Sequence, residues 1–94
     1  MHKAIELLKK IPKGKVATYK EIARVCRTSP RAIGSIMASN KNPREFPCYK
    51  VVSVSGELCG YSGPGGLKTK KKLLQNDGIN LMRGRVPSSY FWKF

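Results

Sequence analysis

The stretch from Phe46 to Val52 holds a cysteine thiol, Cys48, between a proline and two polar side chains. Pro47 fixes its own φ angle and biases the residue before it towards an extended conformation. We therefore expect Cys48 to lie in a stiff turn that leads into a strand. A thiol held in this way can act as a nucleophile, although a cysteine without a paired cysteine is more often a small buried hydrophobe. The elements around the turn must decide between these two roles.

Few other side chains could ligate a metal or assist the thiol. Besides Cys48, the chain has Cys26, Cys59 and a single histidine, His2. An odd number of cysteines without close paired spacing argues against a disulfide framework and against a zinc site. His2 lies at a chain end, where ordering is poor, so an ordinary cysteine–histidine dyad is not expected. We therefore do not predict a bound metal.

The balance of charge points to a polyanionic partner. Nineteen Lys and Arg residues against five Asp and Glu residues give a net charge of +14. Nucleic acid is the first candidate for a partner of such a chain. A membrane surface is the rival, but no apolar run approaches the roughly 20 residues of a transmembrane helix, and a signal-peptide pattern is absent. We therefore expect an intracellular, monomeric protein with one core and no membrane contact.

Two short helices are predicted before residue 27. Apolar residues recur at near-helical spacing over residues 1–10 and stop ahead of a Pro-Lys-Gly-Lys turn. Thr18 is then a good N-cap, and Glu21 completes a capping box over a helix from Tyr19 to Cys26. The cap and the box together predict where this second helix begins.

A third short helix follows after a tight connection. Ser29 caps it, Pro30 takes its first position and it runs through Ser39, so that it forms a helix-turn-helix with the helix before it. Small residues dominate this helix: Ala32, Gly34, Ser35, Ala38 and Ser39. A helix that reads base edges in the major groove normally carries long hydrogen-bonding side chains. This helix is therefore predicted to make a close backbone approach rather than to read sequence.

The residues after the cysteine turn predict a small β-hairpin. Val51, Val52 and Val54 form its first strand, Ser55-Gly56 its turn, and residues 57–61 the returning strand. The glycine-rich run at residues 62–66 either lets a ligand approach the backbone closely or is a flexible connection.

A last helix and a tail complete the chain. Residues 67–76 predict a helix with leucines, Leu67 among them, turned inward and four lysines turned outward: Lys68, Lys70, Lys71 and Lys72. Such lysines usually form a solvated face, but they can also contact phosphates. The tail over residues 79–94 mixes basic and aromatic side chains. It either packs back as an extended segment or stays mobile until nucleic acid binds.

Taken in order, these motifs resemble one family. The matching segments are Pro12-Lys-Gly, Thr18-Tyr19-Lys-Glu-Ile-Ala23, Pro30-Arg31-Ala-Ile-Gly34, Asn40, Pro47-Cys48, Val51-Val52, Gly56, Gly60-Tyr61-Ser62-Gly63, Gly66-Leu67 and Lys70-Lys-Lys-Leu-Leu74. They resemble the C-terminal, DNA-binding and active-site domain of the O6-alkylguanine-DNA alkyltransferases, also called methylated-DNA–protein-cysteine methyltransferases. The likeness runs from Ile5 to Gly78. The family's N-terminal domain has no counterpart in this sequence, as in the single-domain alkyltransferase-like proteins.

The resemblance implies a fold class and a domain organisation. We expect a mainly α fold with a small β-hairpin, arranged as the winged-helix-like helix-turn-helix domain of the alkyltransferases. Residues 1–78 would form this DNA-binding and active-site domain. Residues 79–94 would form a basic and aromatic C-terminal tail.

The resemblance also implies a chemistry and roles for particular residues. Members of the family transfer an alkyl group from O6 of a damaged guanine to their own cysteine, once, irreversibly and without a metal or cofactor. Cys48 would be the acceptor. Arg31 would enter the base stack in place of the flipped nucleotide, and Tyr19 would press on its 3′ phosphate and contact the base. Asn40 would be the hinge between the recognition helix and the active-site turn. A base must leave the duplex before its atoms can meet a thiol.

Two sets of residues would surround the DNA. The base pocket would consist of Tyr19, Cys48, Val51, Tyr61 and Ser62, with Ser62 donating a hydrogen bond towards O6. DNA binding would use Tyr19, Arg31, Ala32, Gly34, Ser35 and Lys50. The small residues in this set would let the helix press against the groove.

The chain departs from the family at the catalytic motif. The family has Pro-Cys-His-Arg, whereas this chain has Pro47-Cys48-Tyr49-Lys50. In the family the histidine relays the thiol proton through water and is oriented by a glutamate after the last helix. Tyr49 and Asp77 occupy these catalytic positions here. Because a free tyrosine has a pKa of about 10, it is a poor proton acceptor at neutral pH. Transfer is therefore expected to be slower, with Cys48 activated by Lys50, by the positive field or by backbone donors.

Three functions remain open. The first is a self-inactivating DNA-repair alkyltransferase that acts on double-stranded DNA containing O6-alkylguanine. The second is an alkyltransferase-like lesion sensor, which binds alkylated guanine without transfer and hands the site to other repair factors. In such sensors the cysteine is characteristically replaced, so Cys48 favours the first function, whereas Tyr49 favours the second. A helix-turn-helix regulator with a structural Cys48 would prefer particular undamaged sequences, which the small side chains of the third helix do not support.

Overall fold

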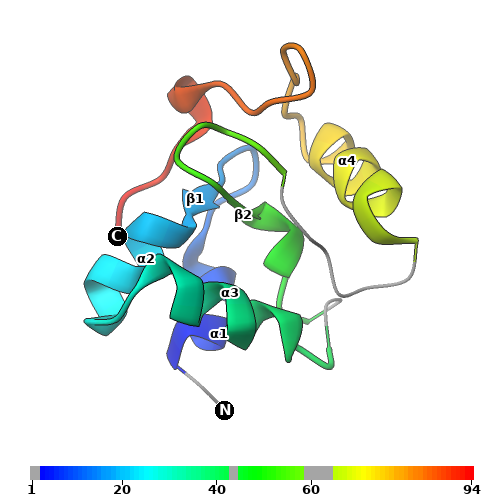
Figure 1. The fold of residues 1–94 in the computed structure, drawn as a ribbon. Coiled ribbons are helices and arrows are strands. Elements are labelled where there is room, and N and C mark those ends of the chain that lie inside the picture. Colours follow the sequence, from blue (N-terminus) through cyan, green and yellow to red (C-terminus); the bar gives the residue numbers. More distant parts are fainter. Residues whose placement is uncertain (1–2, 43–44, 59–64) are drawn as a thin grey trace.

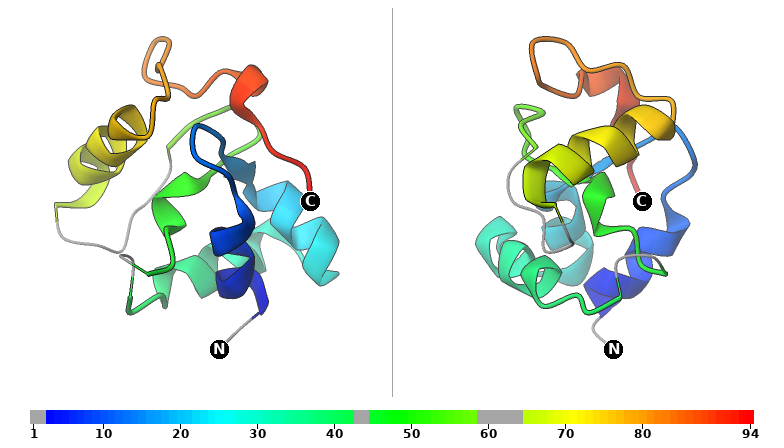
Figure 2. Two further views of the ribbon diagram at one scale, coloured as in Figure 1. Left: turned by 180° about the vertical axis from the view of Figure 1, so that it is seen from behind. Right: turned by 90° about the vertical axis from the view of Figure 1, so that its right-hand side faces the viewer.

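Residues 3–42, 45–58 and 65–94 are described by the structure, a computed structural model. Its elements are α1 (Lys3–Leu7), the 3-10 helix η1 (Leu8–Lys10), β1 (Ala17–Thr18), α2 (Tyr19–Cys26), α3 (Pro30–Ala38), the 3-10 helix η2 (Cys48–Lys50), β2 (Val51–Val52), α4 (Gly66–Asn76) and the 3-10 helix η3 (Ser88–Tyr90). Figure 1 shows α1, α2 and α3 gathered at one end of the molecule and α4 at the other, with the strands and η2 between them. The two views in Figure 2 show the same separation. Within the described ranges, no helix has the length and apolar character needed to cross a membrane.

The two helices of the helix-turn-helix begin at the predicted caps. At the start of α2, the Thr18 hydroxyl accepts a hydrogen bond of 3.0 Å from the Glu21 amide. At the start of α3, the Ser29 hydroxyl accepts one of 3.1 Å from the Ala32 amide. Each cap satisfies a backbone donor that the helix itself leaves free and contributes about 1 kcal/mol. The two helices then pack against each other, so the predicted helix-turn-helix is confirmed.

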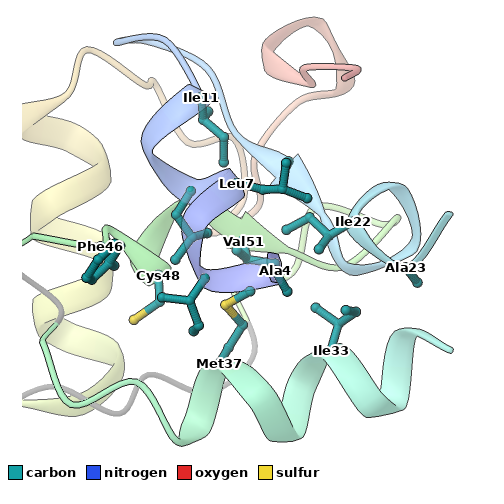
Figure 3. Packing of buried hydrophobic residues seen from close by; sticks show 13 residues of the cluster. Ala4, Leu7, Ile11, Ile22, Ala23, Ile33, Met37, Phe46, Cys48 and Val51 are labelled. Carbon is teal, nitrogen blue, oxygen red and sulfur yellow. The ribbon is translucent and has the colours of Figure 1, made fainter. Parts of the chain in front are cut away.

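The main hydrophobic core lies between α1, α2, α3 and the cysteine turn (Figure 3). The N-terminal segment, predicted as a single helix, is α-helical in α1 and tightens into a 3-10 helix in η1. The buried members of this first cluster are Ala4, Ile5, Leu7, Leu8, Ile11, Ala17, Ile22, Ala23, Ile33, Met37, Phe46, Cys48 and Val51. Full burial of an aliphatic side chain stabilises a fold by about 1.5–3 kcal/mol. Because Phe46, Cys48 and Val51 are buried in this cluster, the cysteine turn is packed firmly against the core.

A second, smaller cluster joins the strands to α4 and to the tail. Its buried members are Val16, Val52, Leu74, Ile79 and Val86. The predicted orientation of α4 is wrong at two positions, because Lys70 is fully buried and Leu67 is 52% exposed. Lys70 lies one helical turn before the buried Leu74 and therefore shares its face. Its ammonium group donates a hydrogen bond of 2.7 Å to the carbonyl of Val51, which satisfies the buried charge's need for a polar partner.

The predicted β-hairpin is wrong in its pairing. Strand β2 pairs in parallel with β1, in the register Ala17 with Val51 and Thr18 with Val52. A tight turn does follow β2, closed by a hydrogen bond of 2.9 Å from the Gly56 amide to the Ser53 carbonyl. Beyond it, Glu57 and Leu58 carry no strand, and residues 59–61 of the predicted returning strand lie outside the described residues. The partner of β2 is thus a segment more than thirty residues away in the sequence, which a local hydrophobic pattern does not reveal.

The turn after β2 packs against the tail. The Val86 amide donates a hydrogen bond of 2.9 Å to the Gly56 carbonyl. Gly56 has a φ angle of +83°, and a Cβ atom on it would lie 2.2 Å from the Val86 carbonyl oxygen. Only glycine fits both this backbone conformation and this approach.

The tail packs back as an extended segment, which is the first of the two predicted alternatives. The Val16 amide donates to the Tyr90 carbonyl at 2.9 Å, and the Trp92 amide donates to the Val16 carbonyl at 2.7 Å. Val16 and Phe91 form a parallel bridge at this point. The tail therefore extends the small sheet beyond β1, on the edge that β2 leaves free.

The last residue of the tail is anchored on α2 through Glu21. The Glu21 carboxylate accepts a hydrogen bond of 2.8 Å from the Phe94 amide and one of 2.7 Å from the Arg24 guanidinium. The hydrogen bond from Arg24 lowers the pKa of Glu21 by more than burial raises it, and the bond from Phe94 lowers it further. The same carboxylate raises the pKa of Arg24.

Candidate active site and DNA-binding helix

Cys48 is the first residue of the 3-10 helix η2 and is held mainly by backbone bonds. Its amide donates a hydrogen bond of 2.8 Å to the Phe46 carbonyl, and the Lys50 amide donates one of 3.1 Å to the Pro47 carbonyl. The predicted stiff turn that leads into a strand is confirmed, because β2 follows η2 directly. Only 5% of Cys48 is exposed. Figure 3 shows the Cys48 side chain at the edge of the first cluster, near Phe46 and on the same side of the cluster as Met37 of α3.

Asn40 connects α3 to the cysteine turn. Its side-chain amide donates a hydrogen bond of 2.8 Å to the Phe46 carbonyl, two residues before Cys48. Its carbonyl oxygen accepts one of 3.1 Å from the Asn42 amide. Asn40 is buried, and both bonds are short-range, so the end of α3 and the start of the turn are held at a fixed separation. The structure thus brings the expected hinge residue next to the expected alkyl acceptor.

Lys50 is placed inside the fold. Its ammonium group lies 3.0 Å from the Asp77 carboxylate and donates hydrogen bonds to the carbonyls of Pro12, at 3.0 Å, and Ile11, at 3.5 Å. Its side chain is 6% exposed. The expected contact of Lys50 with DNA stays a prediction, and it would require this enclosed ammonium group to leave its partners.

Asp77 directly follows α4 and is the ion-pair partner of Lys50. The carboxylate oxygen that binds Lys50 also accepts a hydrogen bond of 2.8 Å from the Gly14 amide. Tyr49 is half-buried and packs against the second cluster, whereas the neighbouring Cys48 belongs to the first. The structure therefore brings Asp77 to Lys50, and it sends the side chains of Cys48 and Tyr49 into different parts of the core.

Lys70 is a residue near the site that the sequence analysis missed. Its bond to the Val51 carbonyl ties α4 to the strand that directly follows the cysteine turn. Val51 itself is fully buried. The one signal in the sequence is that Lys70 precedes the inward Leu74 by four residues. The prediction placed every lysine of this helix on its outer face and therefore overlooked this four-residue spacing.

The outer face of α3 is open. Arg31 and Ser35 are exposed, and Ala32 and Gly34 are half-buried. A Cβ atom built on Gly34 would meet no atom within 4 Å in the described part of the chain. Glycine in a helix costs roughly 0.5–1 kcal/mol relative to alanine. None of the neighbouring residues that the structure describes thus requires glycine at this position.

The remaining predicted pocket residues are only partly placed. Tyr19, at the start of α2, is half-buried and packs against the first cluster. Tyr61 and Ser62 lie outside the described residues. The structure therefore brings together Tyr19, Cys48 and Val51 around the first cluster and leaves the contribution of the glycine-rich loop as a prediction.

Positive charge is weakly compensated on the surface. All five acidic residues lie in the described ranges, and the ion pairs there engage four of them: Glu21, Glu45, Glu57 and Asp77. Nineteen Lys and Arg residues share these few partners. The surplus of cations, Arg31 on α3 included, produces the positive field that a polyanion requires.

The sequence is similar to that of known proteins over most of its length. The family described as "6-O-methylguanine DNA methyltransferase, DNA binding domain" matches residues 1–79. The methylated-DNA–protein-cysteine methyltransferase of Sulfolobus acidocaldarius is 47% identical over 76 residues, which cover 79% of this chain and 46% of that protein. The corresponding protein of Pyrobaculum aerophilum is 48% identical over 68 residues, with coverages of 72% and 45%. The chain thus spans less than half the length of these curated relatives.

Solved structures show the same likeness. S. pombe Atl1, in a complex with damaged DNA containing O6-carboxymethylguanine, superimposes with a TM-score of 0.84 at 25% identity and covers 98% of this chain and 93% of its own. The O6-methylguanine-DNA methyltransferase of Pyrococcus kodakaraensis strain KOD1 has a TM-score of 0.73 at 40% identity, with coverages of 82% and 44%. These superpositions confirm the predicted fold class. The chain belongs to the O6-methylguanine-DNA methyltransferase family, as its DNA-binding domain.

Proposed function

We propose that this chain binds double-stranded DNA as a monomer, flips O6-alkylguanine out of the duplex and transfers the alkyl group to Cys48. The observation that carries the proposal is the position of Cys48, in a turn that Asn40 joins to α3 at 2.8 Å. A helix pressed into a groove and a thiol on a rigid connection can meet one extruded base at the same time.

The transfer needs no component beyond the thiol and the damaged base. The Cys48 sulfur, as thiolate, attacks the alkyl carbon, so that a sulfur–carbon bond forms while the bond from that carbon to guanine O6 breaks. The electron pair of the broken bond stays on the guanine, which takes up a proton and becomes normal guanine. The thioether is stable, so each molecule reacts once.

The contact with DNA would be made by the outer face of α3. The small residues there allow the helix to approach the sugar–phosphate backbone closely, and Arg31 would fill the gap that the flipped base leaves. Unstacking a base costs a few kcal/mol, which such a filler partly offsets. The resemblance to S. pombe Atl1, whose complex contains O6-carboxymethylguanine in DNA, supports binding to a damaged duplex.

Peptide mass spectrometry tests the proposal directly. The protein is incubated with a duplex that contains a single O6-methylguanine, and the Cys48 peptide is expected to gain one methyl group. A duplex of the same sequence with guanine at that position is the control. Methylation of Cys26 in place of Cys48 would contradict the assignment of the acceptor.

A lesion sensor is the second candidate. Two observations favour it: Tyr49 stands where the alkyltransferases have histidine, and the chain matches nearly the full length of Atl1, tail included. An unmodified Cys48 after long incubation, together with binding that prefers the O6-methylguanine duplex, would establish this function. The chain would then mark the lesion for other repair factors.

A further inference from the structure

We propose that Lys50 and Asp77 are a positioning pair that holds the Cys48 turn in place, and that Asp77 does not serve as the carboxylate of a proton relay through Tyr49. The proposal rests on the proposed function, since it concerns the residues that support its acceptor.

Three segments meet at this pair. Lys50 is the last residue of η2, two positions after Cys48, and its ammonium group lies 3.0 Å from Asp77 at the end of α4. The same ammonium group donates to the backbone carbonyls of Pro12 at 3.0 Å and Ile11 at 3.5 Å. The Gly14 amide donates to Asp77 at 2.8 Å. The pair thus connects the cysteine turn to the connection before β1 and to α4.

The pair is enclosed, which distinguishes it from the other ion pairs. The side chains of Lys50 and Asp77 are 6% and 12% exposed. Lys9 and Glu45, which form a pair of 3.1 Å, are 50% and 53% exposed. An exposed pair contributes little to stability, whereas removal of one partner from an enclosed pair leaves an uncompensated charge in a medium of low polarity. Among the ion pairs of the described residues, only Lys50–Asp77 has both partners enclosed, so the loss of either partner should disturb the segments that the pair joins.

The geometry does not suit Asp77 for a relay. A relay carboxylate orients a neutral base and stabilises the positive charge that forms when this base takes up a proton. Here the Asp77 oxygen already binds the Lys50 ammonium group and a backbone amide donor. Tyr49 packs against the second cluster, whereas Cys48 packs against the first.

Double-mutant cycles separate a positioning pair from a relay. The first cycle combines Lys50→Met with Asp77→Asn, and the second combines Tyr49→Phe with Asp77→Asn. Each variant is measured by thermal unfolding without DNA, by affinity for a duplex with one O6-methylguanine, and by the pH dependence of single-turnover methyl transfer. The matched control is the cycle of Lys9→Met with Glu45→Gln, an ion pair of the same type that is half exposed.

A positioning pair predicts coupling between Lys50 and Asp77. Each single substitution is expected to lower Tm by roughly 10–20 °C, and the double substitution, which leaves no buried charge, by clearly less than the sum. The exposed control pair is expected to shift Tm by at most about 5 °C. Transfer is expected to slow by about 10- to 100-fold in either single variant, through misplacement of the turn, with an unchanged midpoint in its pH profile. The conservative Lys50→Arg should recover most of both losses.

Other results would overturn the proposal. Additive effects of Lys50→Met and Asp77→Asn on Tm would show that the pair is not a unit. A shifted midpoint in the pH profile of Asp77→Asn, lost in the Tyr49→Phe background, would show a relay. If the parent protein transfers no methyl group, the proposed transfer fails by itself. The unfolding cycle then still decides whether the pair exists as a positioning unit.

Discussion

Around Cys48, the polar side chains of Asn40, Lys50 and Asp77 bond inside the protein, whereas the face of α3 carries Arg31 and Ser35 open to solvent. The first region is explained by its own contacts, since each side chain holds a segment that leads to the thiol. The second region is not explained in this way, because Gly34 weakens the helix and no residue in the described ranges requires glycine there. Residue types that the fold does not need point to a partner. We therefore infer that the turn positions the thiol and propose that α3 carries recognition.

The largest expected effect is the loss of transfer in Cys48→Ser. A serine hydroxyl is a far weaker nucleophile than a thiolate, so the methylated Cys48 peptide should disappear completely and no serine adduct should replace it. Affinity for the O6-methylguanine duplex should remain within about threefold of the parent, because binding depends on α3. Mass spectrometry and a gel-shift titration measure the two quantities. Lesion binding that vanishes together with transfer would remove the division between the two regions.

Arg31→Ala should act on recognition alone. Without a side chain to fill the vacated stack, preference for the lesion duplex over the undamaged one should fall by roughly tenfold or more, since unstacking costs a few kcal/mol. The unfolding free energy should change by less than about 0.5 kcal/mol, because Arg31 is exposed. Arg27→Ala, an exposed arginine between α2 and α3, is the matched control. Equal losses of lesion preference in the two variants would make Arg31 an ordinary phosphate contact.

Gly34→Ala should separate stability from binding by giving them opposite signs. The added methyl group meets no atom of the described chain, and alanine is the better helix former, so stability should rise by about 0.5–1 kcal/mol. Affinity for duplex DNA should fall severalfold, because the methyl group holds the helix away from the groove. Urea unfolding and fluorescence anisotropy measure the two changes. Unchanged DNA affinity would show that this part of α3 does not approach the duplex closely.

Glu21→Gln should change stability alone, and only above acidic pH. Because the folded protein holds the pKa of Glu21 below its unfolded value of about 4.3, its contribution is fully present above that pH and is lost as the pH falls through the folded pKa. At pH 7 the variant should lose roughly 1 kcal/mol, and near pH 3 the difference from the parent should shrink. Urea unfolding across this pH range checks the prediction. A constant difference at all pH values would show that the Glu21 charge is not what anchors the tail.

Local signals in the sequence were sufficient for the helix-turn-helix. Thr18 and Ser29 accept hydrogen bonds from amides three residues further on, and Pro30 suits the first helical position, which needs no amide donor, so these effects are visible in a short window. The stiff turn at Pro47-Cys48 was predictable for the same reason. A proline restricts its own residue and the one before it, and this restriction does not depend on the rest of the fold.

Contacts between distant segments could not be predicted in this way. The pairing of β2 with β1, the return of the tail to Val16 and the burial of Lys70 each join residues that are far apart in the sequence. A lysine at a helical position is predicted to face solvent unless the carbonyl that accepts its hydrogen bond is known. The same holds for Lys50, which was expected to contact DNA and which forms an ion pair with Asp77.

By itself, the sequence determined the family, the thiol in a rigid turn, the two capped helices and a strong positive charge. These follow from residue types and short spacings, which act through local sterics and hydrogen bonds. Only the tertiary structure decided what the buried charges do. Lys50 pairs with the Asp77 carboxylate, and Lys70 donates to the Val51 carbonyl. A buried ammonium group needs a polar partner in place of water, and the tertiary structure determines which oxygen is close enough.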